Sequence, residues 1–159
     1  LGHFRHEIGH YYWDRLVRDG ELLSEFRSLF GDESTDYSAA LKRHYANAPQ
    51  VHADFISSYA AAHPWEDFAE TFAHYLHMTD TLETAGQFGF ISPALQGFQA
   101  HTEDLQTLLG EWMTLSVALN SLNRSMGAAD AYPFAISARV AEKLGFVHRL
   151  LGKRPPVAA

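Results

Sequence analysis

Three residues near the start of the chain have the types and the spacing of a metal site. His6, Glu7 and His10 form the pattern His-Glu-x-x-His within the stretch "LGHFRHEIGHYYWDRL". Residues i and i+4 of a helix share one face, so His6 and His10 would project side by side and could bind one tetrahedral zinc ion. Glu7 lies about 100° around the helix from His6. There its carboxylate could reach a water on the metal and act as a general base.

A glycine in the middle of this motif indicates close packing. Gly9 costs a helix interior roughly 1 kcal/mol relative to alanine. We therefore expect another element to pack closely against the helix at Gly9.

A zinc site of this kind needs a third protein ligand. The longer metzincin pattern would require glycine at position 13 and histidine at position 16, but the chain has Trp13 and Leu16. The stretch "HPWEDFAETFAHYLH" instead places Glu66 and Glu70 on one face of a later helix. We predict that Glu66 is the third ligand and that Glu70 accepts the free ring N–H of a ligand histidine. The spacing alone also permits the reverse assignment.

Other residues near the motif could complete or compete for such a site. Asp14 follows His10 by four residues and is a candidate partner for the His10 ring. The pattern requires no fourth protein ligand, so the fourth position is predicted to hold water, as in catalytic zinc sites. Competing donors flank the later helix at His63, His74 and His77.

The elements that must position these residues are mainly helical. Apolar side chains recur every three to four residues within several segments, and glycine, proline and helix-capping residues separate these segments. The pattern predicts helices at about 2–18, 22–30, 36–47, 51–62, 64–82, 103–125 and 137–151. Residues 86–98 read as an irregular connection that could hold a short strand, and 152–159 as a loose tail. We predict a mainly α fold with little or no β-sheet, in one domain over 1–159.

Composition excludes several classes of protein. The chain has 159 residues, 47% of them hydrophobic and 19% charged, which is typical of a globular domain. Its net charge of −7 argues against nucleic acid or an anionic membrane as a partner. No apolar stretch approaches the length needed to span a bilayer. The chain has no cysteine, so a metal must be held by His, Asp or Glu.

The sequence also gives expectations about the location and the extent of the protein. The absence of cysteine leaves the compartment open, and we expect a cytoplasmic protein. The oligomeric state is left open. Because the chain begins at Leu1 and enters helical sequence at once, we expect a piece or a processed product of a longer protein.

Several segments together resemble one known family. "GHFRHEIGHYYWDRL", "FRSLFGDE", "YAAAHPWEDFAETFAHYLH" and "LNRSMGAADAYPF" resemble the bacterial zinc-binding metallopeptidases, which are gluzincin-like and combine HExxH with a downstream glutamate. The resemblance covers nearly the whole chain. It implies a zincin-like helical domain with Zn²⁺ held by His6, His10 and Glu66, and Glu7 as general base. Zincins usually have a β-sheet before the HExxH helix, and this chain does not contain it.

The resemblance also implies a residue that stabilises the oxyanion. The wider gluzincin group includes proteases with a tyrosine seven residues before the third ligand, and Tyr59 stands at that spacing. His63 is a rival donor for this role. The sequence thus predicts a zinc-dependent peptidase acting on a peptide or protein substrate. The alternative is a non-catalytic zinc-binding or interaction module on a protease-like fold.

Overall fold

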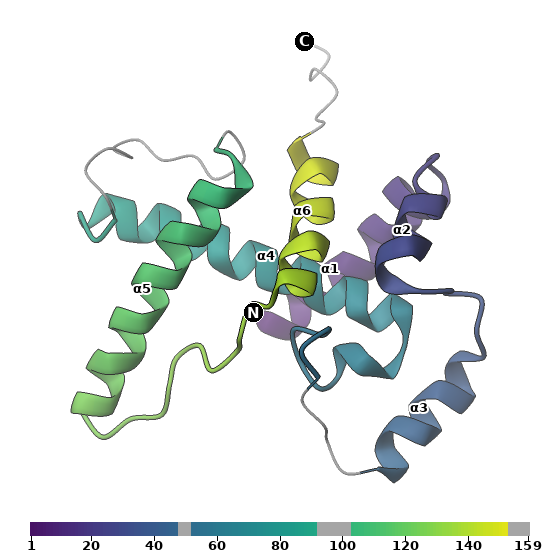
Figure 1. Ribbon diagram of the computed structural model, residues 1–159, viewed down its shortest axis with the longest axis horizontal. Coiled ribbons are helices and arrows are strands. Elements are labelled where there is room, and N and C mark those ends of the chain that lie inside the picture. Colours follow the sequence, from purple (N-terminus) through teal and green to yellow (C-terminus); the bar gives the residue numbers. More distant parts are fainter. Residues whose placement is uncertain (48–51, 92–102, 153–159) are drawn as a thin grey trace. The chain divides into compact units, whose positions relative to one another are not determined.

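The computed structural model describes residues 1–47, 52–91 and 103–152 (Figure 1). Within these ranges the chain forms six α-helices and no strand, which confirms the predicted mainly α fold. The helices are α1 (Gly2–Trp13), α2 (Leu23–Phe30), α3 (Tyr37–Ala46), α4 (Pro64–Gln87), α5 (Leu105–Ser125) and α6 (Ala138–Gly152). A π-helical turn, Asp14–Arg18, follows α1, and a 3-10 turn, Ala60–Ala62, precedes α4.

The chain divides into two compact units, and the prediction of a single domain stays a prediction. The first unit comprises Leu1–Leu76 and the chain from Ala135 onward, and the second comprises His77–Phe134. All residues predicted for the metal site belong to the first unit. The final part of the predicted loose tail, 153–159, lies outside the described residues.

Aromatic rings form the core of the first unit. Phe26 and Phe30 of α2 stack with ring centroids 5.0 Å apart, and Phe68 of α4 packs edge-on against Phe30 at 5.7 Å. Phe146 of α6 lies 5.7 Å from Phe30 and completes the group. These side chains are almost wholly buried, and edge-to-face pairs are a favoured arrangement of aromatic rings. The cluster therefore joins α2, α4 and α6.

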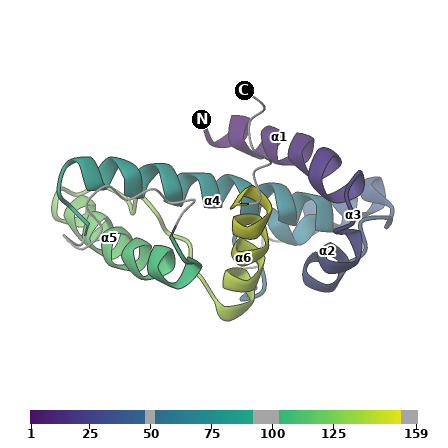
Figure 2. The same ribbon diagram turned by 90° about the horizontal axis from the view of Figure 1, so that it is seen from above.

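Helix α1 approaches α4 closely at Gly9, as the sequence predicts. A β-carbon on Gly9 would lie 3.0 Å from Cα and 3.2 Å from the carbonyl oxygen of Ala69. Figure 2 shows α1 lying across the first half of α4. Only a glycine lets the two backbones approach this closely. His6 and His10 of α1 and Glu66 and Glu70 of α4 are thereby brought to one crossing point.

A buried ion pair attaches α6 to the same helix. Lys143 Nζ lies 2.6 Å from Asp67 Oδ2, and both side chains are almost fully buried. The ammonium also donates to the carbonyl oxygen of Asp54, 2.6 Å away. Burial raises the pKa of Asp67 to about 7, against the opposing effect of the Lys143 charge. A buried charge left without its partner is costly, so this pair fixes α6 and the turn around Asp54 against α4.

The segment predicted as a helix at 51–62 is not one, and the prediction is wrong. Residues 52–59 form successive turns that end in the 3-10 turn, while residue 51 lies outside the described residues. Ser57 Oγ accepts a hydrogen bond from the backbone N–H of Ala60. Such side-chain bonds compete with helical backbone pairing. The Asp54 carbonyl is meanwhile taken by Lys143 rather than by a helical N–H.

Other helix ends agree with the prediction or differ by a few residues. Asp36 caps α3 by accepting from the N–H of Ala39. Gly127 follows α5 with φ of +75°, a conformation that favours glycine at a helix end. Helix α4 continues to Gln87 rather than Leu82, and no strand follows in the described residues up to 91. The rest of the predicted connection, 92–98, lies outside the described residues.

The second unit is organised around α5 and the loop that follows it. Asn120 bonds the backbone of Tyr132 in both directions, at 2.7 Å to its carbonyl and 3.0 Å from its N–H. Trp112 packs edge-on against the Tyr132 ring at 4.8 Å. Arg124 forms a two-pronged ion pair with Asp130. These contacts give the polar residues of α5 a structural role in holding the loop.

None of the helices in the described ranges has the length and apolar character needed to cross a membrane.

The close approach at Gly9 predicts that even one added methyl group will destabilise the protein. In Gly9→Ala the new Cβ would push against the Ala69 backbone, and overpacking of this kind costs about 1–3 kcal/mol. Alanine returns only about 1 kcal/mol of helix propensity. We expect a net decrease in the free energy of unfolding, measured by urea denaturation.

Gly110→Ala in α5 is the matched control. A Cβ on Gly110 has no heavy atom within 4 Å, so this variant should gain about 0.5–1 kcal/mol from helix propensity alone. Equal gains in both variants would show that the crossing at Gly9 is not tight.

Candidate metal centre

Three ligand-type atoms converge where α1 crosses α4. Glu66 Oε2 lies 2.9 Å from Nε2 of His6 and 3.4 Å from Nε2 of His10. The two imidazole Nε2 atoms are 3.1 Å apart. The His6 and Glu66 side chains are almost completely buried, and His10 is nearly so. Among the described residues, His6, His10 and Glu66 form a group able to hold a metal ion.

Hydrogen bonding around His6 shows which of its atoms is free to bind a cation. The Nδ1 atom of His6 donates to Oε1 of Glu70 at 2.7 Å, because an ionised carboxylate can only accept. A neutral His6 ring then has its lone pair on Nε2, which faces the other two groups. Glu66 Oε2 is buried and has no hydrogen-bond partner in the described part of the chain. With the Nε2 atoms of His6 and His10 deprotonated, as metal binding requires, three electron pairs point at one another.

The spacing of these atoms fits a small tetrahedral ion. Zinc bonds of about 2.0–2.1 Å at tetrahedral angles place ligand atoms about 3.3 Å apart. The three observed separations of 2.9, 3.1 and 3.4 Å lie close to that value. Two neutral imidazoles and one carboxylate are also a common donor set for zinc.

A tyrosine that the sequence did not reveal holds the other oxygen of Glu66. The hydroxyl of Tyr37, at the start of α3, donates to Glu66 Oε1 at 2.6 Å. Burial raises the pKa of Glu66, but the neighbouring His10 and His6 side chains and the hydrogen bond from Tyr37 outweigh it and hold that pKa well below its usual range. Burial and the neighbouring Glu66 raise the pKa of Tyr37 to about 12, so its phenol stays a donor. Glu66 is thus ionised and fixed in orientation.

Glu70 links the ring of His6 to the turn before α4. Its Oε1 accepts from His6, and its Oε2 accepts from Ser57 Oγ at 2.6 Å. Burial lowers the pKa of His6, but the adjacent carboxylates of Glu66 and Glu70 outweigh this and raise it to about 9. Burial has the opposite effect on the Glu70 carboxyl and raises its pKa. The hydrogen bonds from His6 and Ser57 outweigh that effect and bring the pKa of Glu70 below its ordinary value. The geometry places Glu66, rather than Glu70, beside both histidines.

A small cavity opens on one side of this group. It has a volume of about 240 Å³ and is lined by Gly2, His3, His6, Glu7, Tyr59 and Glu70. The Glu7 carboxylate is more than half exposed and lies 3.6 Å from the His3 imidazole. The Tyr59 ring lies 5.8 Å from the His6 ring. Both residues predicted to be catalytic therefore line one cavity with a predicted ligand.

Tyr59 is kept in its protonated form. Burial, the negative charge of Glu66 and the neighbouring Tyr37 raise the pKa of Tyr59 above its ordinary value. A protonated phenol can donate a hydrogen bond to a developing negative charge. Tyr59 therefore has the protonation state that its predicted role requires.

Asp14 does not serve the His10 ring, and this prediction is corrected. Its Oδ1 accepts from the Arg18 guanidinium at 2.7 Å. A charged guanidinium one turn ahead is a stronger partner for a carboxylate than a neutral imidazole. Nδ1 of His10 is buried and has no hydrogen-bond partner within the described ranges. The His10 ring is instead held by Trp65, whose ring centroid lies 3.8 Å away.

His63, the rival oxyanion donor, is occupied at the start of α4. Its Nδ1 accepts from the backbone N–H of Trp65, and its Nε2 lies 3.2 Å from both the hydroxyl and the carbonyl oxygen of Thr35. With both ring nitrogens engaged, His63 acts as a helix cap.

Three residues of the centre were missed from the sequence. His3 could have been predicted from the sequence, because it precedes Glu7 by four residues and so lies on the same helix face. No sequence pattern indicates Tyr37 or Ser57. Their hydrogen-bond partners lie 29 and 13 residues away along the chain, so these contacts depend on tertiary structure.

Comparison with known proteins supports the resemblance. The chain belongs to the family described as "Putative zinc-binding metallo-peptidase", whose model matches residues 1–150. It is 48% identical, over 98% of its length, to an uncharacterized protein of Mycobacterium tuberculosis (Rv2568c) and to one of Mycobacterium bovis (Mb2598c). The match covers 47% of each of these proteins, so the chain spans about half the length of the curated relatives it matches. No solved structure matches the chain.

The bond from Tyr37 to Glu66 predicts an effect on metal affinity. Removing the phenol hydroxyl in Tyr37→Phe leaves a buried carboxylate oxygen without its donor, and partners of this kind contribute about 10- to 100-fold to metal affinity. We expect zinc affinity, measured by competition with a chromophoric chelator, to fall by about tenfold or more.

Tyr45→Phe is the control for this measurement. Tyr45 lies on the same helix and its side chain is largely exposed, so this variant should keep the wild-type affinity. Equal affinities in wild type and Tyr37→Phe would mean that the Tyr37 bond does not position a ligand.

Proposed function

We propose that the protein is a zinc-dependent peptidase with His6, His10 and Glu66 as the metal ligands. One observation carries the proposal: three buried lone-pair atoms converge beside a cavity that Glu7 and Tyr59 also line. A purely structural metal site has no need of an accessible carboxylate next to the ligands. The membership of a family described as zinc-binding supports the choice of metal.

Zinc bound here would polarise a scissile carbonyl and lower the pKa of an attacking water toward about 7. Glu7 then accepts the proton of that water and donates it to the leaving amine. Its position fits this work, since the carboxylate lies one residue beyond His6 on α1 and keeps more than half of its surface accessible. Glu70 and Tyr37 hold the ligands His6 and Glu66 in place and take no part in the proton transfer.

Tyr59 donates its phenol hydrogen to the oxygen on which negative charge develops. Donors of this kind contribute about 3–4 kcal/mol to the transition state when they are already in position. The turn before α4 supplies that position, because its backbone places Ser57 on Glu70 and the Tyr59 ring beside His6.

The substrate is a peptide or protein segment that binds along the cavity beside α1. The cavity of about 240 Å³ is too small to enclose more than the groups around the scissile bond. Because the relatives are about twice as long as this chain, further parts of such a protein could contribute to substrate binding.

The proposal predicts that Glu7→Gln separates zinc binding from hydrolysis. Glutamine has nearly the same shape but cannot accept a proton, so kcat/KM on a peptide library should fall by at least about a hundredfold. Zinc affinity should stay unchanged because Glu7 is not a ligand. Peptide cleavage is followed by mass spectrometry, and zinc by chelator competition.

Two comparisons make this test decisive. Glu21→Gln removes an exposed carboxylate outside the site and should leave cleavage intact. Cleavage that survives Glu7→Gln would exclude the mechanism, and a zinc-loaded wild type that cleaves no peptide would favour the non-catalytic zinc-binding module.

A further inference from the structure

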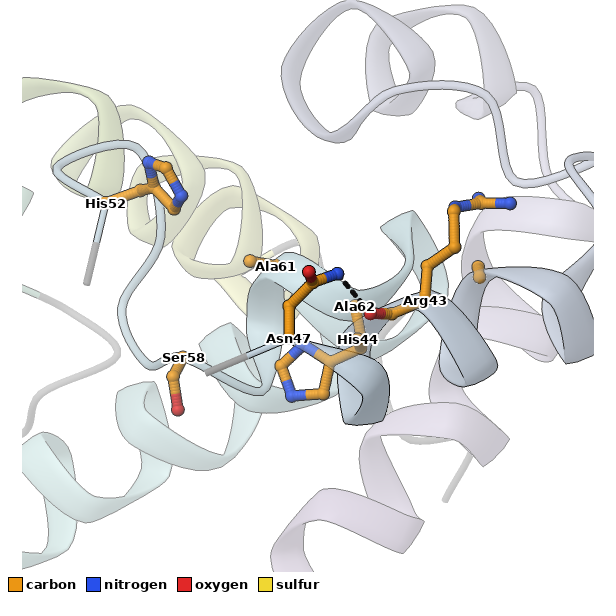
Figure 3. A pocket seen from close by; sticks show the side chains of 8 residues that line it. Arg43, His44, Asn47, His52, Ser58, Ala61 and Ala62 are labelled. Atoms are coloured by element: carbon orange, nitrogen blue, oxygen red, sulfur yellow. Dashed lines mark hydrogen bonds between the residues drawn. The ribbon is translucent and has the colours of Figure 1, made fainter. Parts of the chain in front are cut away.

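A second, larger cavity lies between α3 and the turns that precede α4. It has a volume of about 500 Å³, within the range of small-molecule binding pockets. Arg43 and His44 of α3, Asn47 directly after it, and His52 and Ser58 of the turns line this cavity, and in Figure 3 the Arg43 guanidinium extends away from the His44 and Asn47 side chains. Ala40, Ala61 and Ala62 complete its lining.

The lining of this cavity is rich in N–H donors and has no carboxylate among the described residues. Arg43 has a permanently charged guanidinium, which makes no ion pair in the described part of the chain. His44 and His52 each offer at least one ring N–H or ring nitrogen in any protonation state. The chain as a whole has a net charge of −7. The lining of this cavity differs from it, because its described residues include a positive charge and no negative one.

The cavity adjoins the candidate metal centre through Tyr59. The His44 ring packs edge-on against Tyr59 with centroids 5.9 Å apart, and Tyr59 in turn lies 5.8 Å from His6. Ser58 and Ala61, which line the cavity, flank Tyr59 on the same turn. Tyr59, which lines the smaller cavity, therefore lies beside a residue that lines the larger one.

We propose that this cavity binds a carboxylate of the peptide substrate, with Arg43 supplying the charge. The inference rests on the proposed peptidase function and adds a substrate class to it. Both an acidic side chain and a free C-terminus present this chemistry. A guanidinium recognises a carboxylate through paired N–H groups, which a neutral amide cannot match.

The test measures peptide binding directly, so that it does not depend on catalysis. Two alanine-rich peptides are blocked at both ends and contain a single Glu or a single Gln. A third contains the single Gln and has a free C-terminal carboxylate, and each peptide has a fluorophore for anisotropy. They are titrated into the zinc-loaded Glu7→Gln variant, which holds substrate without turnover, and into the zinc-loaded wild type. We expect the Glu peptide or the free-carboxylate peptide to bind about fivefold or more tightly than its neutral counterpart.

Two charge variants locate the effect. Arg43→Gln, in the Glu7→Gln background, should remove the preference for a carboxylate. Lys42→Gln is the matched control, because it removes the same charge from the neighbouring exposed position, which does not line the cavity. It should keep the preference.

The outcomes identify the source of the carboxylate, and they distinguish failure of the cavity proposal from failure of the peptidase proposal. A preference for Glu assigns the cavity to a side chain, and a preference for the free terminus assigns it to the C-terminal carboxylate. Equal binding of charged and neutral peptides, no binding of any, or equal effects of the two charge variants would overturn the inference. Cleavage of neutral peptides without preference would leave the peptidase function standing, whereas carboxylate binding without any cleavage would remove the peptidase function alone.

Discussion

The close approach of α1 to α4 at Gly9 and Ala69 is the constraint on which the rest of the centre depends. A β-carbon at Gly9 would already be within 3.0 Å of the Ala69 backbone, so the two helices are as near as side chains permit. Since His6 and His10 flank Gly9 on one helix, and Glu66 and Glu70 flank Ala69 on the other, this one contact sets all the ligand distances. A shift of a few tenths of an ångström there would change every separation in the centre.

The close approach of α1 and α4 places the charged carboxylates of Glu66 and Glu70 where few water molecules can reach them. Glu66 is almost wholly buried, and Glu70 lies one turn away on the same face. Two carboxylates in a poorly solvated site are unfavourable unless each has donors. Tyr37 and Ser57 supply one neutral donor apiece, and the histidines face the remaining oxygens. A divalent cation would relieve the same problem more completely, because its charge offsets the carboxylates where neutral donors only orient them.

Most of this centre could be predicted from the sequence because its core consists of local patterns. The i, i+4 spacing of His6 and His10, the matching pair Glu66 and Glu70, and the cost of Gly9 are all properties of single helices. Asp14 lies four residues from both His10 and Arg18, and it pairs with Arg18. Spacing alone does not determine which of the two residues it binds. Tyr37 could not be predicted, because its bond to Glu66 exists only through the placement of α3 against α4.

The main error in the predicted fold lies in a segment that contacts the site through Ser57 and Tyr59. Residues 51–62 have an amphipathic pattern, but the described residues from 52 form turns. A helix would have used its backbone groups internally and spread its side chains around an axis. As turns, the segment instead places Ser57 on Glu70, Tyr59 beside His6, and Ser58 and His52 in the larger cavity. Its apolar periodicity is satisfied by burial of Ile56, Ala60 and Ala62. The same pattern thus serves the core without a helix, and the turns supply side chains to both cavities.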